Sequence, residues 1–459
     1  MRKATCYIGA VSLLSQSAKV RLDALGKEKV LPLLLRLSLP ASLALLSTAL
    51  YNIIDTFWVT RLGPNAVAGV TLIFPLQLVF TALGTGTGVG ISSLVSRLHG
   101  KGSTSSNDKG QVNKVAGHIL PLTLLLSLPL LFVVFLLRQK LLLFLGATAT
   151  TELSANDYVG FVTLASPFLI FSMLASNLLR GSGDTVTPMK AMGFCALLNA
   201  VADPILIFGW GPIAAMGVKG AAVATGGSQL IGAIYLLWRV LGQVKSPTLQ
   251  KSVVREIYKV GLPAASATVI LTAVVGFHNR VLSPHGAVAL GAYGILFRLY
   301  SLVFMPSYGI CQGLLPIVGH AEGQENKERL QEAISKGALL AAAWGGVTGA
   351  LVILFAKPIV TLFGGTAELT VEASRALRLA GLGWLAAGPQ LVWVTALHGM
   401  GRGGPSLFVL LVKTAGLLVP LVWFLGVAYG PLGVWLAQPL AEYGGLLVAW
   451  LVIRGQSGR

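Results

Sequence analysis

The chain has 459 residues, of which 54% are hydrophobic and only 11% are charged, with a mean hydropathy of +0.78 and a net charge of +18. A soluble domain carries roughly 25% charged residues, so this composition excludes an ordinary water-soluble protein. The excess of positive charge is compatible with nucleic-acid binding. The basic residues lie mainly between apolar stretches, however, and this pattern favours a membrane topology with no nucleic-acid partner.

Long apolar stretches recur along the whole chain. About twelve of them approach the ~20 residues that a membrane-spanning helix needs, and the second and eighth are long enough to be tilted or bent. We therefore predict an all-α integral membrane protein with twelve transmembrane helices. In chain order they fall at residues 37–60, 67–97, 115–137, 158–180, 191–209, 219–238, 260–282, 288–320, 337–356, 376–399, 406–428 and 432–453.

The basic residues between these helices indicate an orientation. With both chain ends in the cytoplasm, about three quarters of the 34 Lys and Arg residues, Lys413 among them, fall in cytoplasmic segments, as the positive-inside rule requires. Arg298 falls inside a predicted helix. We therefore expect a multi-pass protein of the plasma (inner) membrane with both termini cytoplasmic.

Residues 1–30 are less apolar than the rest, and we interpret them as an N-terminal cytoplasmic extension. Arg2 and Lys3 precede a short apolar run, which resembles a weak signal peptide, and a start codon assigned upstream of the native one is a further alternative. The basic stretch that follows favours the extension. The three cysteines, Cys6, Cys195 and Cys311, are scattered and give no metal or disulfide spacing.

The chain is duplicated. Pro40 recurs as Pro263, and the same spacing pairs Phe74 with Phe297, Gly86 with Gly309, Gly90 with Gly313 and Gly100 with Gly323. Each copy holds an even number of helices, so both enter the membrane from the same side, and we expect an axis along the membrane normal to relate them. We predict an extension at 1–30, a six-helix lobe at 31–240, a cytoplasmic linker at 241–258 and a second six-helix lobe at 259–459, forming a V-shaped pair of pseudo-symmetric lobes.

A carboxylate lies in the middle of the first predicted helix. Asp55 occupies the position that His278 holds in the second copy, and Tyr51 lies one turn earlier on the same face. A charged side chain at this depth costs about 2.5–3.5 kcal/mol on insertion scales, and such groups usually face a transport pathway. The alternative is that the Asp55 carboxylate forms a purely structural ion pair with an Arg or Lys.

The fifth predicted helix carries a second carboxylate, Asp203, with Asn199 one turn earlier on the same face. Pro204 has no N–H, so the carbonyl of Ala200 loses its helical partner. These groups predict a cation or proton site, and a purely structural kink network is the alternative. Thr225 in the next helix is expected to add a hydroxyl group, although threonine also bonds its own backbone.

The remaining unusual residues favour structural roles. We expect Arg298 to neutralise Glu442, the third acid within an apolar helix, and we expect His278 to be a packing residue. The glycines of the second helix indicate close helix packing. No HExxH sequence, nucleophile elbow or Walker motif occurs, which disfavours an enzyme or an ATP-driven pump. A channel of symmetric subunits is disfavoured because Asp55 and His278 differ.

Several stretches of the sequence resemble a known family of membrane transporters. LSLPASLALLSTALYNIIDTFWVTRLGPNAVAGV, together with RLHGKG, resembles the opening of the multidrug and toxic compound extrusion (MATE) family. RGSGDTVTPM and NAVADPILIFGWGPIAAMGVKGAAVAT resemble its fourth to sixth helices. The aspartate of the first helix with the Asn-xxx-Asp-Pro of the fifth is similar to the DinF-like branch. The resemblance covers about residues 30–455.

The resemblance implies a secondary active multidrug efflux transporter with drug-like small-molecule substrates, working by alternating access. We expect a monomer, because one twelve-helix chain would suffice, and no cofactor. The implied site comprises Tyr51, Asp55, Asn199, Asp203 and Thr225, with H⁺ or Na⁺ as coupling ion; sodium ligands would be Asp55, Asn199, Asp203 and Thr225. Protonation is expected to neutralise the site, repack the first helix and displace a bound cationic drug. The alternative is a lipid-linked oligosaccharide or lipid flippase, which needs several Arg and Lys in its cavity.

Overall fold

The computed structural model describes residues 20–102, 109–148, 151–244 and 246–457. Within these ranges the chain is helical apart from short turns and one isolated pairing of Trp210 with Ile213. Eleven helical stretches are long and apolar enough to cross a membrane, and one of them, Lys251–Gly323, contains two passes because the chain turns back at residues 283–285. The predicted all-α membrane fold with twelve passes is confirmed.

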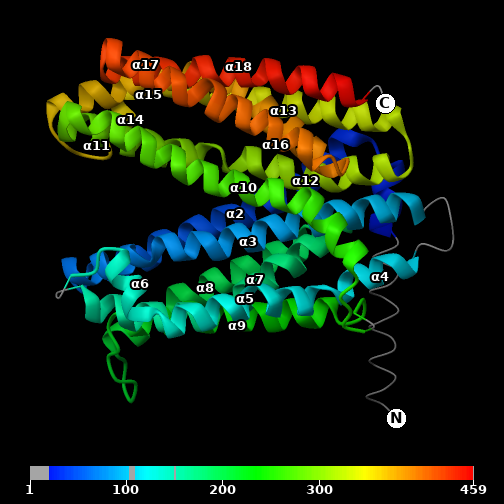
Figure 1. Cartoon of the computed structure of the whole chain (residues 1–459), viewed down its shortest axis with the longest axis horizontal. Coiled ribbons are helices and arrows are strands. Elements are labelled where there is room, and N and C mark those ends of the chain that lie inside the picture. Colours follow the sequence, from blue (N-terminus) through cyan, green and yellow to red (C-terminus); the bar gives the residue numbers. More distant parts are fainter. Residues whose placement is uncertain (1–19, 103–108, 149–150, 245, 458–459) are drawn as a thin grey trace.

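The first lobe is formed by the helices that precede residue 241 and lies in the lower half of Figure 1. Its longest helix contains Pro75 and spans 39 residues, which is enough for a tilted pass. The helices are α2 (Val30–Thr60), α3 (Pro64–Gly102), α4 (Lys109–Gly117), α5 (Ile119–Leu136), α6 (Arg138–Phe144), α7 (Glu152–Gly181), α8 (Val186–Phe208) and α9 (Val218–Val240).

The second lobe lies above it in the same view. Its first helix begins at Lys251, so the last part of the predicted linker is already helical. The eighth pass is interrupted at Phe304, just before Pro306, whose ring cannot continue a regular helix. The elements are α10 (Lys251–Leu282), η1 (Ser283–His285), α11 (Gly286–Val303), α12 (Met305–Gly323), α13 (Lys327–Leu354), α14 (Ala356–Thr361), α15 (Ala367–Gly399), α16 (Gly403–Leu411), the π-helix η2 (Val412–Leu418), α17 (Val419–Tyr429) and α18 (Pro431–Ser457).

Glycines allow the two lobes to touch backbone to backbone. A Cβ atom at Gly100 would collide with Gly323, and one at Gly323 would collide with Gly100. These two residues are equivalent positions of the sequence repeat, so the pseudo-symmetry axis passes between them. Gly86 of α3 packs on α10 and Gly309 of α12 packs on α2, which is the same contact made twice. The duplication therefore builds a near-symmetric interface between the lobes around Gly86, Gly100, Gly309 and Gly323. We call this interface the seam.

The seam occupies only one end of the molecule. An apolar cluster at that end joins Leu33 and Leu34 of α2 to Leu314 of α12. Towards the other end each lobe has its own core, one containing Phe80 and the other Trp435. The ribbons of the two lobes accordingly diverge towards the left of Figure 1, which gives the predicted V shape.

A short helical segment at residues 20–27 lies across the closed end. Leu25 is fully buried, and its carbonyl accepts a hydrogen bond of 2.8 Å from Arg329 of the second lobe. Arg21 forms an ion pair of 3.3 Å with Asp184 of the first lobe. The described part of the predicted extension therefore contacts both lobes, while residues 1–19, including the signal-like stretch, lie outside the described residues.

The seam predicts a packing effect. Replacing Gly100 with Leu inserts a side chain where the backbone of Gly323 lies, so we expect the free energy of unfolding to fall by about 1–3 kcal/mol. Thermal unfolding of the detergent-solubilised protein, followed by tryptophan fluorescence, measures this change. The control is Gly276→Leu on α10, where a side chain meets open space. Equal melting temperatures for the two variants would contradict the close approach.

Candidate functional site

The predicted site residues of the first lobe come together from three helices. We call Tyr51 and Asp55 of α2, Asn199 and Asp203 of α8, and Thr225 of α9 the first-lobe cluster. The Tyr51 hydroxyl donates a hydrogen bond of 3.2 Å to the Thr225 hydroxyl. The Asn199 amide donates one of 3.0 Å to the Asp203 carboxyl group. The structure thus places side chains that are up to 174 residues apart in one polar group.

The local sequence explains this arrangement. Asn199 and Asp203 are four residues apart, so the amide lies directly over the carboxyl group on one face of α8. Both side chains are fully buried, and Thr225 is nearly so. Helix α8 continues through Pro204 to Phe208, so the proline frees a carbonyl without ending the helix. Helix α2 packs against α8 and directs Asp55 towards it.

The cluster has more hydrogen-bond acceptors than its described neighbours can satisfy. Asp55 Oδ1, Asn199 Oδ1 and Asp203 Oδ2 are buried, and none has a hydrogen-bond partner among the described residues. The ion pairs of the described chain include neither aspartate. Unpaired buried acceptors are costly, and carboxylate, amide and hydroxyl oxygens suit a proton or a hard cation. The described residues contain no group of three His, Cys, Asp or Glu side chains that would hold a metal ion.

Two neighbours of the cluster were not predicted from the sequence. Tyr158 of α7 is buried and interacts electrostatically with both Asp55 and Asp203. Its hydroxyl accepts a hydrogen bond of 3.4 Å from Gln77 of α3. Neither residue carries a charge or a recognisable spacing, so only the packing of α3 and α7 shows that they belong here.

The predicted partner of Glu442 is wrong. Glu442 of α18 pairs with Lys413 of η2 at 2.7 Å, and its side chain is 3% exposed. The Arg298 side chain is exposed on α11 and makes no described ion pair with Glu442. Lys413, expected in a cytoplasmic segment, instead lies inside the second lobe. A buried carboxylate pairs with the cation on the helix that adjoins it, and the sequence does not show that η2 and α18 are adjacent.

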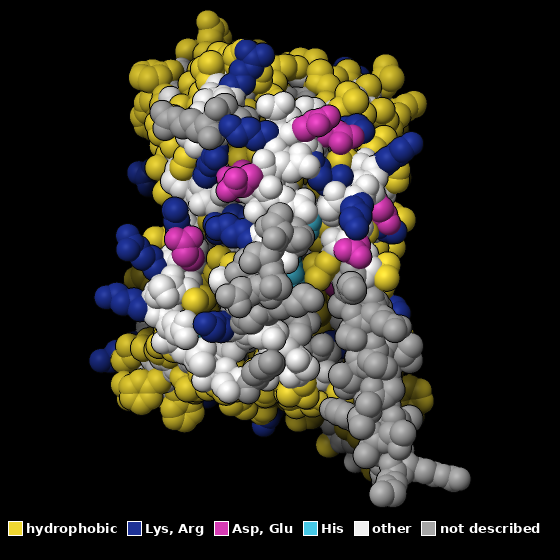
Figure 2. Space-filling view, turned by 90° about the vertical axis from the view of Figure 1, so that its right-hand side faces the viewer, with side chains coloured by type: hydrophobic (Ala, Val, Ile, Leu, Met, Phe, Trp, Pro, Cys, Tyr) yellow, Lys and Arg dark blue, Asp and Glu magenta, His cyan; other side chains and the backbone are white. Residues whose placement is uncertain are grey.

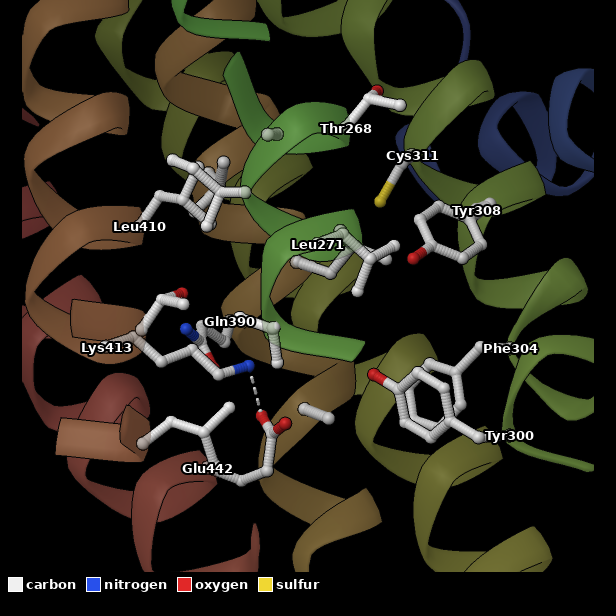
Figure 3. Close-up of a pocket in the computed structure, with 18 of the residues that line it drawn as sticks. Thr268, Leu271, Tyr300, Phe304, Tyr308, Cys311, Gln390, Leu410, Lys413 and Glu442 are labelled. Carbon is white, nitrogen blue, oxygen red and sulfur yellow. Dashed lines mark hydrogen bonds and ion pairs between the residues drawn. The ribbon is translucent and has the colours of Figure 1, made fainter. Parts of the chain in front are cut away.

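The second lobe encloses a cavity of about 450 Å³. We call it the second-lobe cavity; its walls come from α10, α11, α12, α15, α16, η2 and α18, with Thr85 and Val89 of α3. Figure 3 shows Lys413 and Glu442 on one side and Tyr300, Phe304 and Tyr308 on the other. The sequence did not locate a cavity at these residues, because aromatic residues on separate helices are indistinguishable from ordinary core residues.

His278 lies at the edge of this cavity. It is buried, its Nδ1 is 2.9 Å from the Val274 carbonyl, and its ring is stacked on Tyr293 with centroids 5.0 Å apart. The histidine that replaces Asp55 in the second copy therefore packs against an aromatic ring.

The first-lobe cluster predicts an energetic coupling. Replacing Asn199 with Ala removes a donor from a buried carboxyl group, so we expect a loss of about 1–3 kcal/mol in unfolding free energy. In an Asp203→Ala background the same change should cost less, because the acceptor is gone. Chemical denaturation of all four proteins should give a coupling of about 0.5–3 kcal/mol. Purely additive effects would show that the hydrogen bond contributes nothing.

Comparison with known proteins places the chain in a family. The profile of the family called MatE matches residues 40–205 and 263–424, and the two ranges begin at the repeated prolines Pro40 and Pro263. The matched ranges make up more than half of the chain.

Relatives match over almost the whole length. A protein of Shewanella oneidensis named FAD transporter is 25% identical over 418 residues, covering 89% of this chain and 91% of its own. A protein of Thermotoga maritima named probable multidrug resistance protein NorM is 28% identical over 418 residues, covering 88% of each chain.

A solved structure described as the outward-facing conformation of a multidrug resistance MATE family transporter of the MOP superfamily has a TM-score of 0.86. It shares 26% sequence identity and covers 95% of this chain and 97% of its own. The expected resemblance to the MATE family is confirmed. The chain therefore belongs to the MatE family, whose members are multi-pass membrane transporters and not enzymes.

Proposed function

We propose that this protein is a secondary active exporter of amphipathic, often cationic, drug-like compounds, exchanged for H⁺ or Na⁺ by alternating access. One observation carries the proposal: two carboxyl groups in the first lobe lie among buried acceptor oxygens without a described basic partner. Such a site attracts a cation when charged and releases it when neutralised. The multidrug name of the Thermotoga relative supports the same substrate class.

Helix α2 provides a mechanical link from the site to the seam. It carries Tyr51 and Asp55 at the first-lobe cluster and Ser38 and Ser42 at the glycine contacts with α12. Pro40 lies between the two serines, where it weakens the helical hydrogen bonding. Neutralising the cluster removes the charge that holds a cationic drug and lets α2 repack against α8. A shift of α2 is then transmitted to the seam that holds the lobes together.

The coupling ion stays open between H⁺ and Na⁺. A proton needs only a carboxyl group in water-poor surroundings, which Asp55 and Asp203 both offer. Sodium needs several oxygen ligands, and Asp55, Asn199, Asp203 and Thr225 together present carboxylate, amide and hydroxyl oxygens. The pair of aspartates and the Asn-xxx-Asp-Pro sequence also support membership of the DinF-like branch.

A lipid-linked or nucleotide-like anion is the competing cargo, since the Shewanella relative is named an FAD transporter. Pyrophosphate recognition relies on several Arg or Lys side chains. In the second-lobe cavity, as described, Lys413 is already paired with Glu442. This neutral pair favours the drug-like substrate over a flippase or a nucleotide carrier.

The charge distribution supports an orientation in which both termini are cytoplasmic. Figure 2 looks onto the closed end of the V, and Lys and Arg side chains are spread over this face between apolar flanks. By the positive-inside rule this end faces the cytoplasm, so the V opens outward. We further propose a monomer in the plasma (inner) membrane, with lobes at 31–240 and 259–459 and a linker at 241–258.

The proposed coupling predicts gradient-driven efflux. In proteoliposomes, ethidium efflux should follow an imposed proton gradient or an imposed sodium gradient, applied separately. We expect Asp55→Asn and Asp203→Asn to lower the gradient-driven rate at least tenfold, because neither can change its charge. The control is Glu328→Gln at an exposed position of α13.

The efflux experiment tests the coupling site, the coupling ion and the class of cargo. Wild-type rates in either aspartate variant would exclude the first-lobe cluster as the coupling site. Efflux under one gradient alone identifies the coupling ion. No efflux under either gradient would overturn the drug-export proposal in favour of a lipid-linked or anionic cargo.

The orientation predicts opposite labelling of the two ends. With the three native cysteines replaced, Asn65→Cys at the open end should react with a membrane-impermeant maleimide in intact cells. Gln250→Cys at the closed end should react only after permeabilisation. Both positions are exposed, so access depends on the side of the membrane. The reverse pattern would invert the proposed topology.

A further inference from the structure

The second-lobe cavity has the properties of a ligand site that the coupling mechanism does not use. Its volume of about 450 Å³ lies within the range of about 300–1,000 Å³ that is usual for small-molecule sites. Thr85 and Val89 of the first lobe form part of its wall, so it lies where the two lobes face each other. No residue of the first-lobe cluster lines this cavity.

One wall of the cavity is aromatic. The rings of Tyr300 and Phe304 are stacked with centroids 4.3 Å apart, and Trp384 meets both edge-on. In Figure 3 the hydroxyl groups of Tyr300 and Tyr308 point from the right-hand wall towards the middle of the drawn pocket. Aromatic rings are stabilised by stacked or edge-on contacts in addition to their burial. This wall therefore suits a flat aromatic ring.

Three buried side chains that line the cavity have hydrogen-bonding capacity that no described residue uses. The Trp384 N–H, Gln390 Oε1 and His278 Nε2 have no partner, and the three residues are at most 5% exposed. His278 Nδ1 faces the Val274 carbonyl, so Nδ1 carries the hydrogen and Nε2 is the acceptor. An unsatisfied buried polar group carries the full cost of its lost hydration. A ligand with a ring N–H or a ring oxygen would remove part of this cost.

The charges of the cavity form one compact pair. Lys413 and Glu442 are joined at 2.7 Å, and no other Lys, Arg, Asp or Glu is found among the described residues of its lining. A ligand cation meets repulsion from Lys413, and a ligand anion meets repulsion from Glu442. A ligand that carries both charges side by side can align antiparallel to the pair and is attracted by both residues.

The spacing of the pair selects one kind of zwitterion. In an α-amino acid the ammonium nitrogen and the carboxylate carbon are both bonded to Cα, so the nitrogen and the nearer carboxylate oxygen lie about 2.7 Å apart. This separation equals the 2.7 Å between Lys413 Nζ and Glu442 Oε2. Zwitterions with charges at opposite ends of a long molecule do not match it.

The backbone conformation at Lys413 also favours a functional role for this residue. It lies on η2, a π-helix in the middle of a membrane pass, and π-helical turns are rare and concentrated at functional sites. The widened turn presents the ammonium group to the cavity and to Glu442, as Figure 3 shows.

We propose that the second-lobe cavity binds aromatic α-amino acids and compounds built on them. The ring lies against Tyr300 and Phe304, the carboxylate meets Lys413, and the ammonium group meets Glu442. This adds a substrate class to the proposed export function and rests on that function for transport, whereas binding itself needs no gradient.

A set of ligands with one ring tests the proposal. Equilibrium binding to the purified full chain in lipid nanodiscs is measured for three indole compounds. L-Tryptophan carries both charges, tryptamine carries only the positive charge, and indole-3-propionate carries only the negative charge. We expect L-tryptophan to bind at least tenfold more tightly than the other two. L-Alanine, which has the charges without the ring, should not compete. Equal affinities for the three indole compounds, or no binding of L-tryptophan, would overturn the proposal.

Variants connect the binding to the cavity. Lys413→Met and Glu442→Gln should each weaken L-tryptophan binding at least tenfold. Because loss of one partner from a buried pair is strongly destabilising, the double variant Lys413→Met/Glu442→Gln and the wall variant Tyr300→Leu are measured as well. Glu328→Gln is the control. Wild-type affinity in the double variant would place the bound amino acid elsewhere and exclude this site.

Failure of the proposed amino-acid site and failure of the proposed drug export give different experimental results. If ethidium efflux is gradient-driven but L-tryptophan does not bind, only the inference about the second-lobe cavity fails. If L-tryptophan binds through Lys413 and Glu442 but no gradient drives ethidium efflux, the cavity stands and drug export falls.

Discussion

The organisation of this protein depends on the cost of placing polar groups where lipid offers no hydrogen bonds. Backbone groups avoid that cost by forming helices throughout the described membrane passes. Ionisable side chains avoid it by facing the interior of a lobe, as Asp55, Asp203, Lys413 and Glu442 do. The polar chemistry is thereby gathered into two interior sites, one in each lobe.

The two lobes arise from one sequence repeat but accommodate their buried charged groups differently. The first lobe keeps two carboxyl groups among unpartnered oxygens, and such buried acceptors cost free energy until a donor or cation satisfies them. The second lobe has His278 where the first has Asp55, and its buried acid is neutralised by Lys413. The ion coupling that we propose therefore belongs to the first lobe, while the second lobe has a cavity with aromatic walls and one neutral charge pair.

The seam connects the two lobes, and helix α2 connects the seam to the first-lobe cluster. Glycines at repeated positions let α2 and α3 approach α10 and α12 so closely that the backbones touch. Packed backbones slide or separate as rigid bodies rather than deform. Since α2 takes part in both the first-lobe cluster and the seam, a change of charge at Asp55 has a direct structural path to the contact between the lobes.

The sequence by itself determined the number of passes, the duplication and the five residues of the first-lobe cluster. Apolar length, the spacing of Pro40 and Pro263 and the cost of Asp55 and Asp203 in lipid are all properties that a linear chain displays. Only the tertiary structure decided that Lys413, not Arg298, neutralises Glu442. It also decided that Tyr158, bonded to Gln77, lies near the aspartates and that aromatic rings line a cavity. These facts depend on which helices are neighbours and how far each is rotated, and an apolar helix packs equally well in many such arrangements.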